Sequence, residues 1–251
     1  MEHWYYYVLL VIVGIIVGII NTMSGGGSLL TLPVLIFVGL PSNVANGTNR
    51  IAIFIQSIFN IAGYQSKKAI DKSVFPIYLS ISATIGAIIG AKLAIDIKGE
   101  LFNKILAVVM MTIVVFMVFR PKQNFNDLAD RITGKYLKYS IIAFFFIGIY
   151  GGFIQAGTGI FILLALSSIN HLTLIKSNVI KILVMFVYTS AALLMFGFNL
   201  KLDWVAGLTL ASGQAVGGWF TSRWSVNKGD HIVKVFLIIM VSGMAIKLWF
   251  F

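Results

Sequence analysis

The stretch Asn21-Thr22-Met23-Ser24-Gly25-Gly26-Gly27 interrupts an apolar run, which resumes as Ser28–Leu40. A second stretch, Gln155-Ala156-Gly157-Thr158-Gly159, interrupts the chain in the same way before Ile160–Ile169. Glycine weakens a helix and exposes its backbone, which is costly in lipid. Glycine breaks at matching points of two halves are typical of the midplane binding site of a membrane transporter. The two stretches therefore predict both the class of fold and the place of the site.

The composition indicates a polytopic membrane protein. Of the 251 residues, 59% are hydrophobic and 11% are charged, and the mean hydropathy is +0.96. A soluble domain of this length does not need so much apolar surface. The net charge of +11 comes from lysines and arginines in short stretches between apolar segments, where they orient helices against the membrane. We therefore expect contact with lipid and no binding of nucleic acid.

Metal and cofactor chemistry have no sequence signal in this chain. It contains no cysteine, and its three histidines follow no metal-ligand spacing. The phosphate-binding pattern GxxxxGK[ST] does not occur, and no nucleophile–base pair is recognisable. We expect no metal, no cofactor and no enzymatic activity.

Apolar segments follow one another along the whole chain. They are Trp4–Ile20, Ser28–Leu40, Ile51–Tyr64, Val74–Ile95, Leu101–Phe119, Leu137–Phe153, Ile160–Ile169, Val179–Phe198, Trp204–Ser222 and Ile232–Phe251. A spanning helix needs about 20 residues at ~1.5 Å each, so the two segments after the glycine breaks are too short to cross. Each is expected to fold back on the helix before it, as a hairpin that ends near mid-membrane. The alternative is one full crossing with a glycine kink.

The two halves of the chain match beyond their glycine breaks, at a spacing of roughly 130 residues. The matched positions are Thr48-Asn49 with Ser177-Asn178, Asp71 with Asp203, Gly86-x-x-x-Gly90 with Gly213-x-x-x-Gly217, and Lys98-Gly99 with Lys228-Gly229. The GxxxG faces predict close helix packing. We expect an all-α protein with two homologous transmembrane repeats, residues 1–119 and 139–251, joined by a linker over 120–138. Each repeat would contain a glycine-broken hairpin and three transmembrane helices.

The distribution of positive charge favours inverted repeats. With a hairpin at each break, 13 of the 19 lysines and arginines lie on one side of the membrane and six on the other. With two full crossings, the split is 10 to 9. The positive-inside rule favours the hairpins, which place the linker 120–138 in the cytoplasm and both termini outside.

Polar side chains within the apolar segments concentrate near the breaks, and such residues are costly unless they have a function. The helix that resumes after a break presents free N–H groups and a partial positive charge. Together with amides, hydroxyls and two cations, these groups suit a small oxyanion. The expected substrate-binding residues are Asn21, Ser24, Gly25, Gly26, Gly27, Thr48, Asn49, Arg50, Gln155, Thr158, Gly159, Ser177, Asn178 and Lys181.

These residues also have structural interpretations. The glycines could serve only helix packing, Asn49 and Asn178 could hold helices together, and Arg50 could reach the membrane surface. All eight acidic residues fall at segment ends or in loops, so no proton or sodium relay is expected at mid-membrane. We therefore expect an anion to be the partner of Arg50 and Lys181.

A family resemblance rests on the first break and the motif after it. The quoted residues are Ser24-Gly25-Gly26-Gly27-Ser28-Leu29-Leu30-Thr31-Leu32-Pro33, Gly39-Leu40-Pro41 and Asn46-Gly47-Thr48-Asn49-Arg50. They resemble the first-repeat signature of the TauE/SafE sulfite exporters, also called TSUP permeases, and the resemblance covers nearly the whole chain. It implies a secondary transporter that moves sulfite, thiosulfate, sulfonates or related anions across the inner membrane of a prokaryote. The second repeat departs from the signature, since it has fewer glycines and its basic residue, Lys181, lies two positions later.

Export is the function we expect, and two others stay open. Outward movement of one negative charge releases ~2.3 kcal/mol at an inside-negative potential of 100 mV, so export needs no coupled ion. The first alternative is an importer of the same anions that is coupled to an ion gradient. The second is a membrane assembly subunit that transports nothing and whose polar residues only join helices.

The topology gives a first testable prediction. Reporter enzymes fused after Asn126 should report a cytoplasmic position, and those fused at either terminus should report an external one, because the charge split requires it. A cytoplasmic C-terminus together with a cytoplasmic Asn126 would contradict the inverted arrangement.

Overall fold

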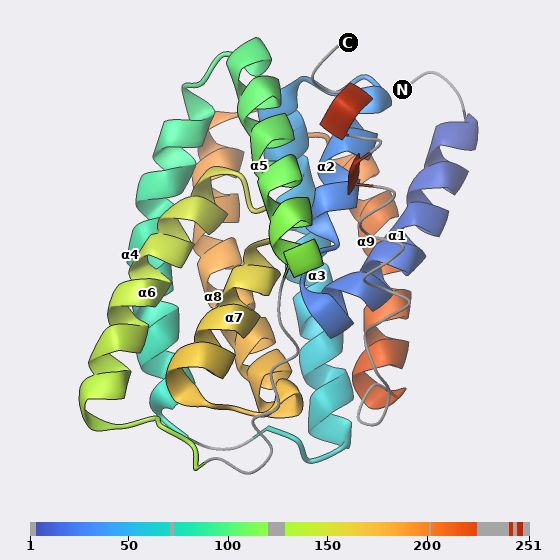
Figure 1. Cartoon of the computed structure of the whole chain (residues 1–251). Helices are drawn as coiled ribbons and strands as arrows, with labels where there is room; N and C mark the ends of the chain where they lie inside the picture. Colours follow the sequence, from blue (N-terminus) through green and yellow to red (C-terminus); the bar gives the residue numbers. More distant parts are fainter. Residues whose placement is uncertain are drawn as a thin grey trace.

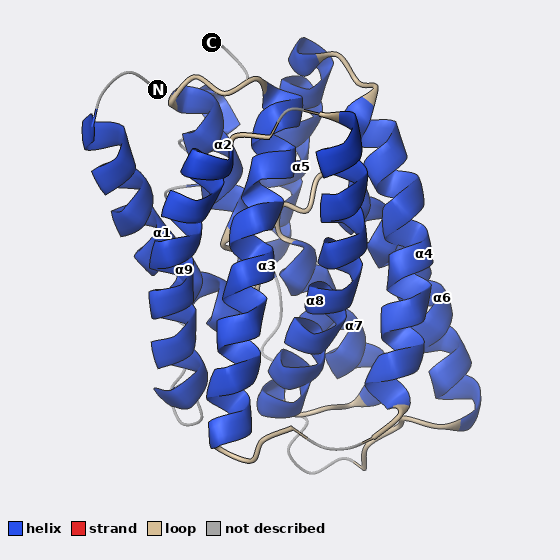
Figure 2. Ribbon diagram, turned by 180° about the vertical axis from the view of Figure 1, so that it is seen from behind, coloured by secondary structure: helices blue, strands red, loops and turns tan. Residues whose placement is uncertain are grey.

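The computed structural model describes residues 4–70, 73–119, 129–200, 202–224, 241–242 and 245–247. These residues form helices and no strand, which confirms the all-α class (Figures 1 and 2). The helices are α1 (Trp4–Ser24), α2 (Ser28–Phe37), α3 (Ser42–Ser66), α4 (Phe75–Ile95), α5 (Gly99–Phe119), α6 (Gly134–Phe153), α7 (Thr158–Asn170), α8 (Leu174–Asn199) and α9 (Trp204–Trp224).

Several helices have the length and composition of membrane spans. Within the described ranges, α1, α4, α6 and α8 are long and apolar enough to cross a membrane, whereas α2 and α7 are apolar but shorter. The outer face of α4 exposes Ile77, Ile81 and Ile85. An apolar surface of this kind is favourable against lipid and unfavourable against water.

Both short helices fold back, as expected. In Figure 1, α1 descends from the top and α2 returns to it, while α6 rises from the bottom and α7 returns there. The end of α7 is fixed beside the start of α6, because Asn170 Nδ2 donates to the Arg131 carbonyl (2.7 Å) and Ser140 Oγ donates to Asn170 Oδ1 (3.0 Å). The residues at the start of α1 and the end of α2 share one apolar cluster, which includes Leu10 and Leu35.

The main correction to the expected segments concerns α3. This helix begins at Ser42, not at Ile51, so the motif that ends in Arg50 lies inside it. The polar residues of the motif lower the local hydropathy, but their side chains are buried and can bond within the protein. The expected segment Ile232–Phe251 lies mostly outside the described residues, as do Asp71, Lys228 and residues 120–128 of the linker.

Glycines bring two pairs of helices into close contact. Gly14 and Gly18 of α1 face α9, and a Cβ built on Gly213 of α9 would lie 2.2 Å from the Val11 carbonyl oxygen. In the other pair, a Cβ on Gly148 of α6 would lie 2.2 Å from the Ala83 carbonyl oxygen of α4. These contacts confirm the packing role expected for the GxxxG faces.

The close pairs join the two predicted repeats. The first helix of the first predicted repeat, α1, packs on α9 of the second. The first helix of the second predicted repeat, α6, packs on α4 of the first. Figures 1 and 2 show that α1 and α6 run in opposite directions. This reciprocal packing is what inverted repeats would produce, although the duplication and its orientation in a membrane stay predictions.

The α4–α6 contact generates a prediction about stability. Gly148→Ala would force the two helices apart, because its Cβ would collide with backbone. Overpacking costs about 1–3 kcal/mol, which corresponds to a loss of roughly 2–10 °C in melting temperature for a chain of this size. Thermal unfolding of the purified protein in detergent would measure the loss. Gly197→Ala in α8 is the matched control, since a Cβ there meets nothing within 4 Å and the melting temperature should not fall.

Candidate functional site

The two glycine breaks meet inside the protein. A Cβ built on Gly25 would lie 2.4 Å from the carbonyl carbon of Gly159, and one built on Gly159 would lie 2.5 Å from the Gly25 Cα. Gly25 has a φ of +75°, a left-handed conformation that side chains disfavour. Two of the expected site glycines are thus in direct contact. Gly26 and Gly27 are buried beside them.

Each break is fastened to the long helix that follows it. In the first half, Asn21 Nδ2 donates to Gln56 Oε1 of α3 (3.0 Å), and Asn21 Oδ1 accepts from the Gly27 N–H (3.1 Å). In the second half, Gln155 Nε2 donates to Thr189 Oγ1 of α8 (3.0 Å). The structure therefore places Asn21 and Gln155 at equivalent points of the two breaks.

Arg50 reaches from α3 to the end of α6. Its side chain is fully buried and lies 4.6 Å from the centre of the Phe196 ring. One terminal nitrogen donates to the Gly151 carbonyl (3.1 Å), and the other donates to the Gly152 carbonyl (2.5 Å) and to Asn46 Oδ1 (3.4 Å). The guanidinium therefore covers carbonyl groups in the last turn of the broken helix.

Lys181 makes the corresponding contacts from α8 to the end of α1. Its side chain is also fully buried. The ammonium group donates to the carbonyls of Asn21 (2.8 Å) and Thr22 (3.0 Å) and to Asn178 Oδ1 (2.6 Å). Each broken helix thus ends against a cation that the other half of the chain supplies.

These contacts give the two cations partners within the protein, while an anion as their partner stays a prediction. The last carbonyls of a helix have no partner within it and carry a partial negative charge, so they can stabilise a buried cation. Both terminal nitrogens of Arg50 face such carbonyls. The Nε–H of Arg50 has no partner among the described residues.

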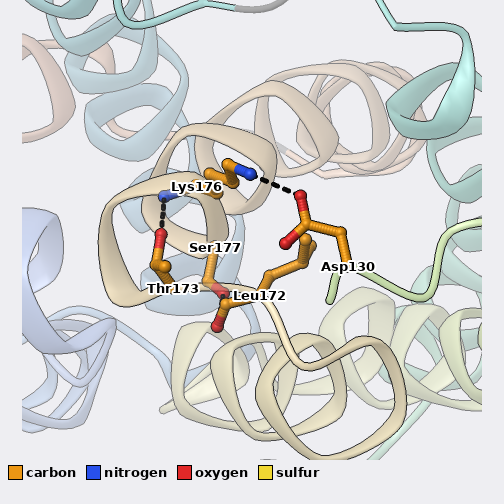
Figure 3. A network of polar contacts seen from close by, with 5 residues as sticks. All are labelled: Asp130, Leu172, Thr173, Lys176 and Ser177. Atoms are coloured by element: carbon orange, nitrogen blue, oxygen red, sulfur yellow. Dashed lines mark hydrogen bonds and ion pairs between the residues drawn. The ribbon is translucent and has the colours of Figure 1, made fainter. Parts of the chain in front are cut away.

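Other expected site residues bond elsewhere. Thr48 Oγ1 accepts from the Asp203 N–H at the start of α9 (3.1 Å), and Ser24 Oγ donates to the Ile20 carbonyl within α1 (3.0 Å). Ser177 Oγ donates to the Leu172 carbonyl (3.4 Å). Figure 3 shows Ser177 at the start of α8, near the ion pair between Lys176 and Asp130. Thr48 and Ser177 thus bond to residues outside the breaks, whereas Ser24 directly precedes Gly25 at the crossing.

Asn49 differs from its neighbours because its side chain lacks a hydrogen-bond partner. It is fully buried, and neither Oδ1 nor Nδ2 bonds to any of the described residues. It lies seven positions before Gln56, or about two turns along the same face of α3. A buried amide without a partner costs about 1–3 kcal/mol, so Asn49 is available to a ligand.

Several residues that surround the crossing were not expected from the sequence. Tyr188 is fully buried, and its ring lies where a Cβ on Gly151 would point, beside Thr158. Tyr150 donates its hydroxyl to the Ala156 carbonyl of the second break. Tyrosines in apolar segments give no signal that separates them from lipid-facing aromatic residues. Asn46, the residue that contacts Arg50, was detectable as a polar residue within a buried helix.

Comparison with known proteins agrees with this architecture. The family described as sulfite exporter TauE/SafE matches residues 10–248. The chain is 27% identical over 240 residues to the probable membrane transporter protein ORF9 of Sinorhizobium sp, which covers 95% of this chain and 90% of that protein. It is 25% identical over 241 residues to a probable membrane transporter protein of Haemophilus influenzae (96% and 93% covered).

A third relative is the probable membrane transporter protein YfcA of Escherichia coli K12, which is 26% identical over 240 residues (96% and 88% covered). No solved structure matches the chain. Because the family match extends over nearly the whole chain, the protein belongs to the sulfite exporter TauE/SafE family of membrane transporters.

Proposed function

We propose that this protein is a secondary transporter that exports a small sulfur-containing oxyanion, such as sulfite, thiosulfate or a sulfonate, across the inner membrane of a prokaryotic cell. Membership of the family and the names of the relatives support transport. The family's description as a sulfite exporter supports the sulfur oxyanion and the outward direction, and the positive charge of the interior supports an anion.

The proposed transporter consists of two inverted repeats, residues 1–119 and 139–251, with residues 120–138 as a cytoplasmic linker. The two hairpins, the opposite directions of α1 and α6 and the reciprocal glycine contacts support this arrangement. Inverted repeats allow one half to rock against the other around a fixed site, which gives access to each side of the membrane in turn.

The proposed substrate site is the crossing of the breaks, where Gly25 meets Gly159. The observation that supports it most directly is the charge of the interior. Among the described residues, the buried side chains with a full charge are Arg50 and Lys181, and both are positive. The N-termini of α2 and α7 begin beside the crossing and add partial positive charge. Such a site attracts an anion and repels a cation.

Hydrogen bonds to the anion would come from both sides of the crossing. Backbone N–H groups near Gly26 and Gly159 are the proposed donors from the breaks, because glycine permits close approach. The Asn49 side chain is the proposed donor from α3, since its amide has no other partner among the described residues. Asn21, Gln155 and Thr158 shape the site through their bonds at the breaks.

The test of this function is anion flux through the purified protein in proteoliposomes. Radiolabelled sulfite should move at a saturable rate, and an imposed potential should drive it toward the positive side, because the anion carries the current. Empty liposomes are the control.

The alternatives give different results. Flux that requires a sodium or proton gradient would support the coupled importer. Absence of flux for sulfite, thiosulfate and methanesulfonate alike would contradict a sulfur-oxyanion transporter and favour an assembly subunit.

Asn49 provides a second prediction, which separates substrate binding from folding. Asn49→Leu should leave the melting temperature unchanged or raise it, because the variant removes a buried amide that has no partner. The same change should weaken sulfite binding by roughly tenfold or more, since a hydrogen bond to a charged group contributes about 1.5–3 kcal/mol. Thermal unfolding and calorimetric titration of the purified variant would measure both.

Gln56→Leu is the matched control on the same face of α3. Gln56 accepts from Asn21 and donates to the Gly18 carbonyl (3.1 Å), so its loss should lower the melting temperature by leaving these groups without partners. If Asn49→Leu also unfolds at a lower temperature and binds sulfite normally, Asn49 is a structural residue.

A further inference from the structure

We propose that Arg50 and Lys181 act on the substrate through the broken helices and not as its ligands. Each cation cancels the negative end of one broken helix and thereby gives the break a net positive charge. This inference rests on the proposed transport of an anion and assigns the two residues a positioning role in it.

A helix break is electrically balanced when it stands alone. The helix before the break ends in carbonyls that carry about −0.5 elementary charge, and the helix after it begins with N–H groups that carry about +0.5. At a break the two ends lie close together, so their fields largely cancel. A pair of glycine breaks is therefore not by itself selective for anions.

The positions of the two cations change that balance. Arg50 donates to the carbonyls of Gly151 and Gly152, and Lys181 donates to those of Asn21 and Thr22. Both cations thus lie on the carbonyl side of a break and leave its N–H side open. Each break then carries about one net positive charge, if the terminal charges are about half an elementary charge each.

The contacts of Arg50 and Lys181 also argue against direct binding. Both terminal nitrogens of Arg50 donate to backbone carbonyls, which leaves Nε as its one nitrogen without a partner among the described residues. The ammonium of Lys181 donates to two carbonyls and to Asn178. An anion that took the terminal nitrogens of Arg50 or the ammonium of Lys181 would draw these donors away from the carbonyls of Gly151, Gly152 and Thr22, and unpaired buried carbonyls are costly. A field that acts through the helix ends attracts the anion and keeps those bonds.

A neighbouring asparagine allows a test that leaves both cations in place. Asn178 Oδ1 lies 2.6 Å from Lys181 Nζ, so Asn178→Asp keeps the size and the acceptor but neutralises the ammonium. Asn46 cannot be used in the same way for Arg50, because its Nδ2 donates to the Phe153 carbonyl (2.7 Å) and an aspartate would lose that bond. Asn178→Asp should not lower the melting temperature, because it replaces a neutral acceptor by an ion pair.

The expected effect depends on the charge of the anion. Loss of one unit charge at roughly 10 Å, with an effective dielectric constant of ~20, should weaken binding of methanesulfonate (charge −1) by about tenfold. Thiosulfate (charge −2) should lose about the square of that factor, or roughly a hundredfold. A structural role would weaken the two anions equally. Dissociation constants from calorimetric titration would give both ratios.

Two control variants separate a field from a ligand. Asn178→Ala removes the side chain but keeps the charge of Lys181. The dissociation constants of both anions should therefore stay within about threefold of those of the unchanged protein, a change no larger than that from loss of one surface ion pair. Lys181→Gln keeps a donor for the helix carbonyls but loses the charge, so it should reproduce the charge-dependent loss.

Each result supports or overturns one specific statement. If the unchanged protein binds neither methanesulfonate nor thiosulfate, the proposed function fails and the positioning role fails with it. If the unchanged protein binds them and Asn178→Asp binds both equally well, the function stands and the positioning role is wrong. An equal loss in Asn178→Ala and Asn178→Asp would make Asn178 itself a ligand and would also overturn the inference.

Discussion

The structure depends on one constraint, which is that a helix broken inside a membrane must have its free backbone groups satisfied by protein. Lipid offers no hydrogen bonds, and the ends of α1 and α6 leave carbonyls without partners. Arg50 bonds to such carbonyls of α6 and Lys181 to the Thr22 carbonyl of α1, and Asn21 accepts from the N–H of Gly27. The buried polar residues near the breaks are therefore consequences of interrupting two helices.

The same constraint determines how closely the helices pack. Gly25 and Gly159 touch, and the breaks would separate if either carried a side chain. The glycine contacts of α1 with α9 and of α4 with α6 keep the surrounding helices near enough for Arg50 and Lys181 to reach their carbonyls. Close helix packing and the hydrogen bonding of buried backbone carbonyls thus support each other, because each needs small residues at defined places.

Much of the fold could be predicted from the sequence, because its signals are local. A segment that is too short to span a membrane predicts a hairpin, and GxxxG spacing predicts close packing. The start of α3 was predicted wrongly because hydropathy is also a local signal. Hydropathy falls over residues 42–50, although the helix continues there and its polar groups bond to distant parts of the chain.

Less of the candidate site could be predicted. The partners of Arg50 and Lys181 are backbone carbonyls, which have no signature in a sequence. Matching of motifs paired Thr48-Asn49 with Ser177-Asn178, whereas the structure gives Asn46 and Asn178 the corresponding contacts with the cations. Motifs are matched by residue identity, whereas side-chain contacts depend on which residues share a face of the helix. The residues that correspond by motif and those that correspond by contact can therefore differ by a few positions. The substrate-binding set as a whole stays a prediction.

The reciprocal contacts of the two cations have a consequence for the biogenesis of the protein. When the first part of the chain enters the membrane, Arg50 has only Asn46 of its own helix as a partner, because α6 has not been synthesised. A central arginine costs about 2.5–3.5 kcal/mol during insertion, so α3 must either remain near the insertion machinery or draw water toward itself. The end of α1 likewise waits for Lys181. Arg50 gains its carbonyl partners when α6 arrives and Lys181 brings its own charge with α8, so the newly made helices should be released into lipid only after α8 has been made.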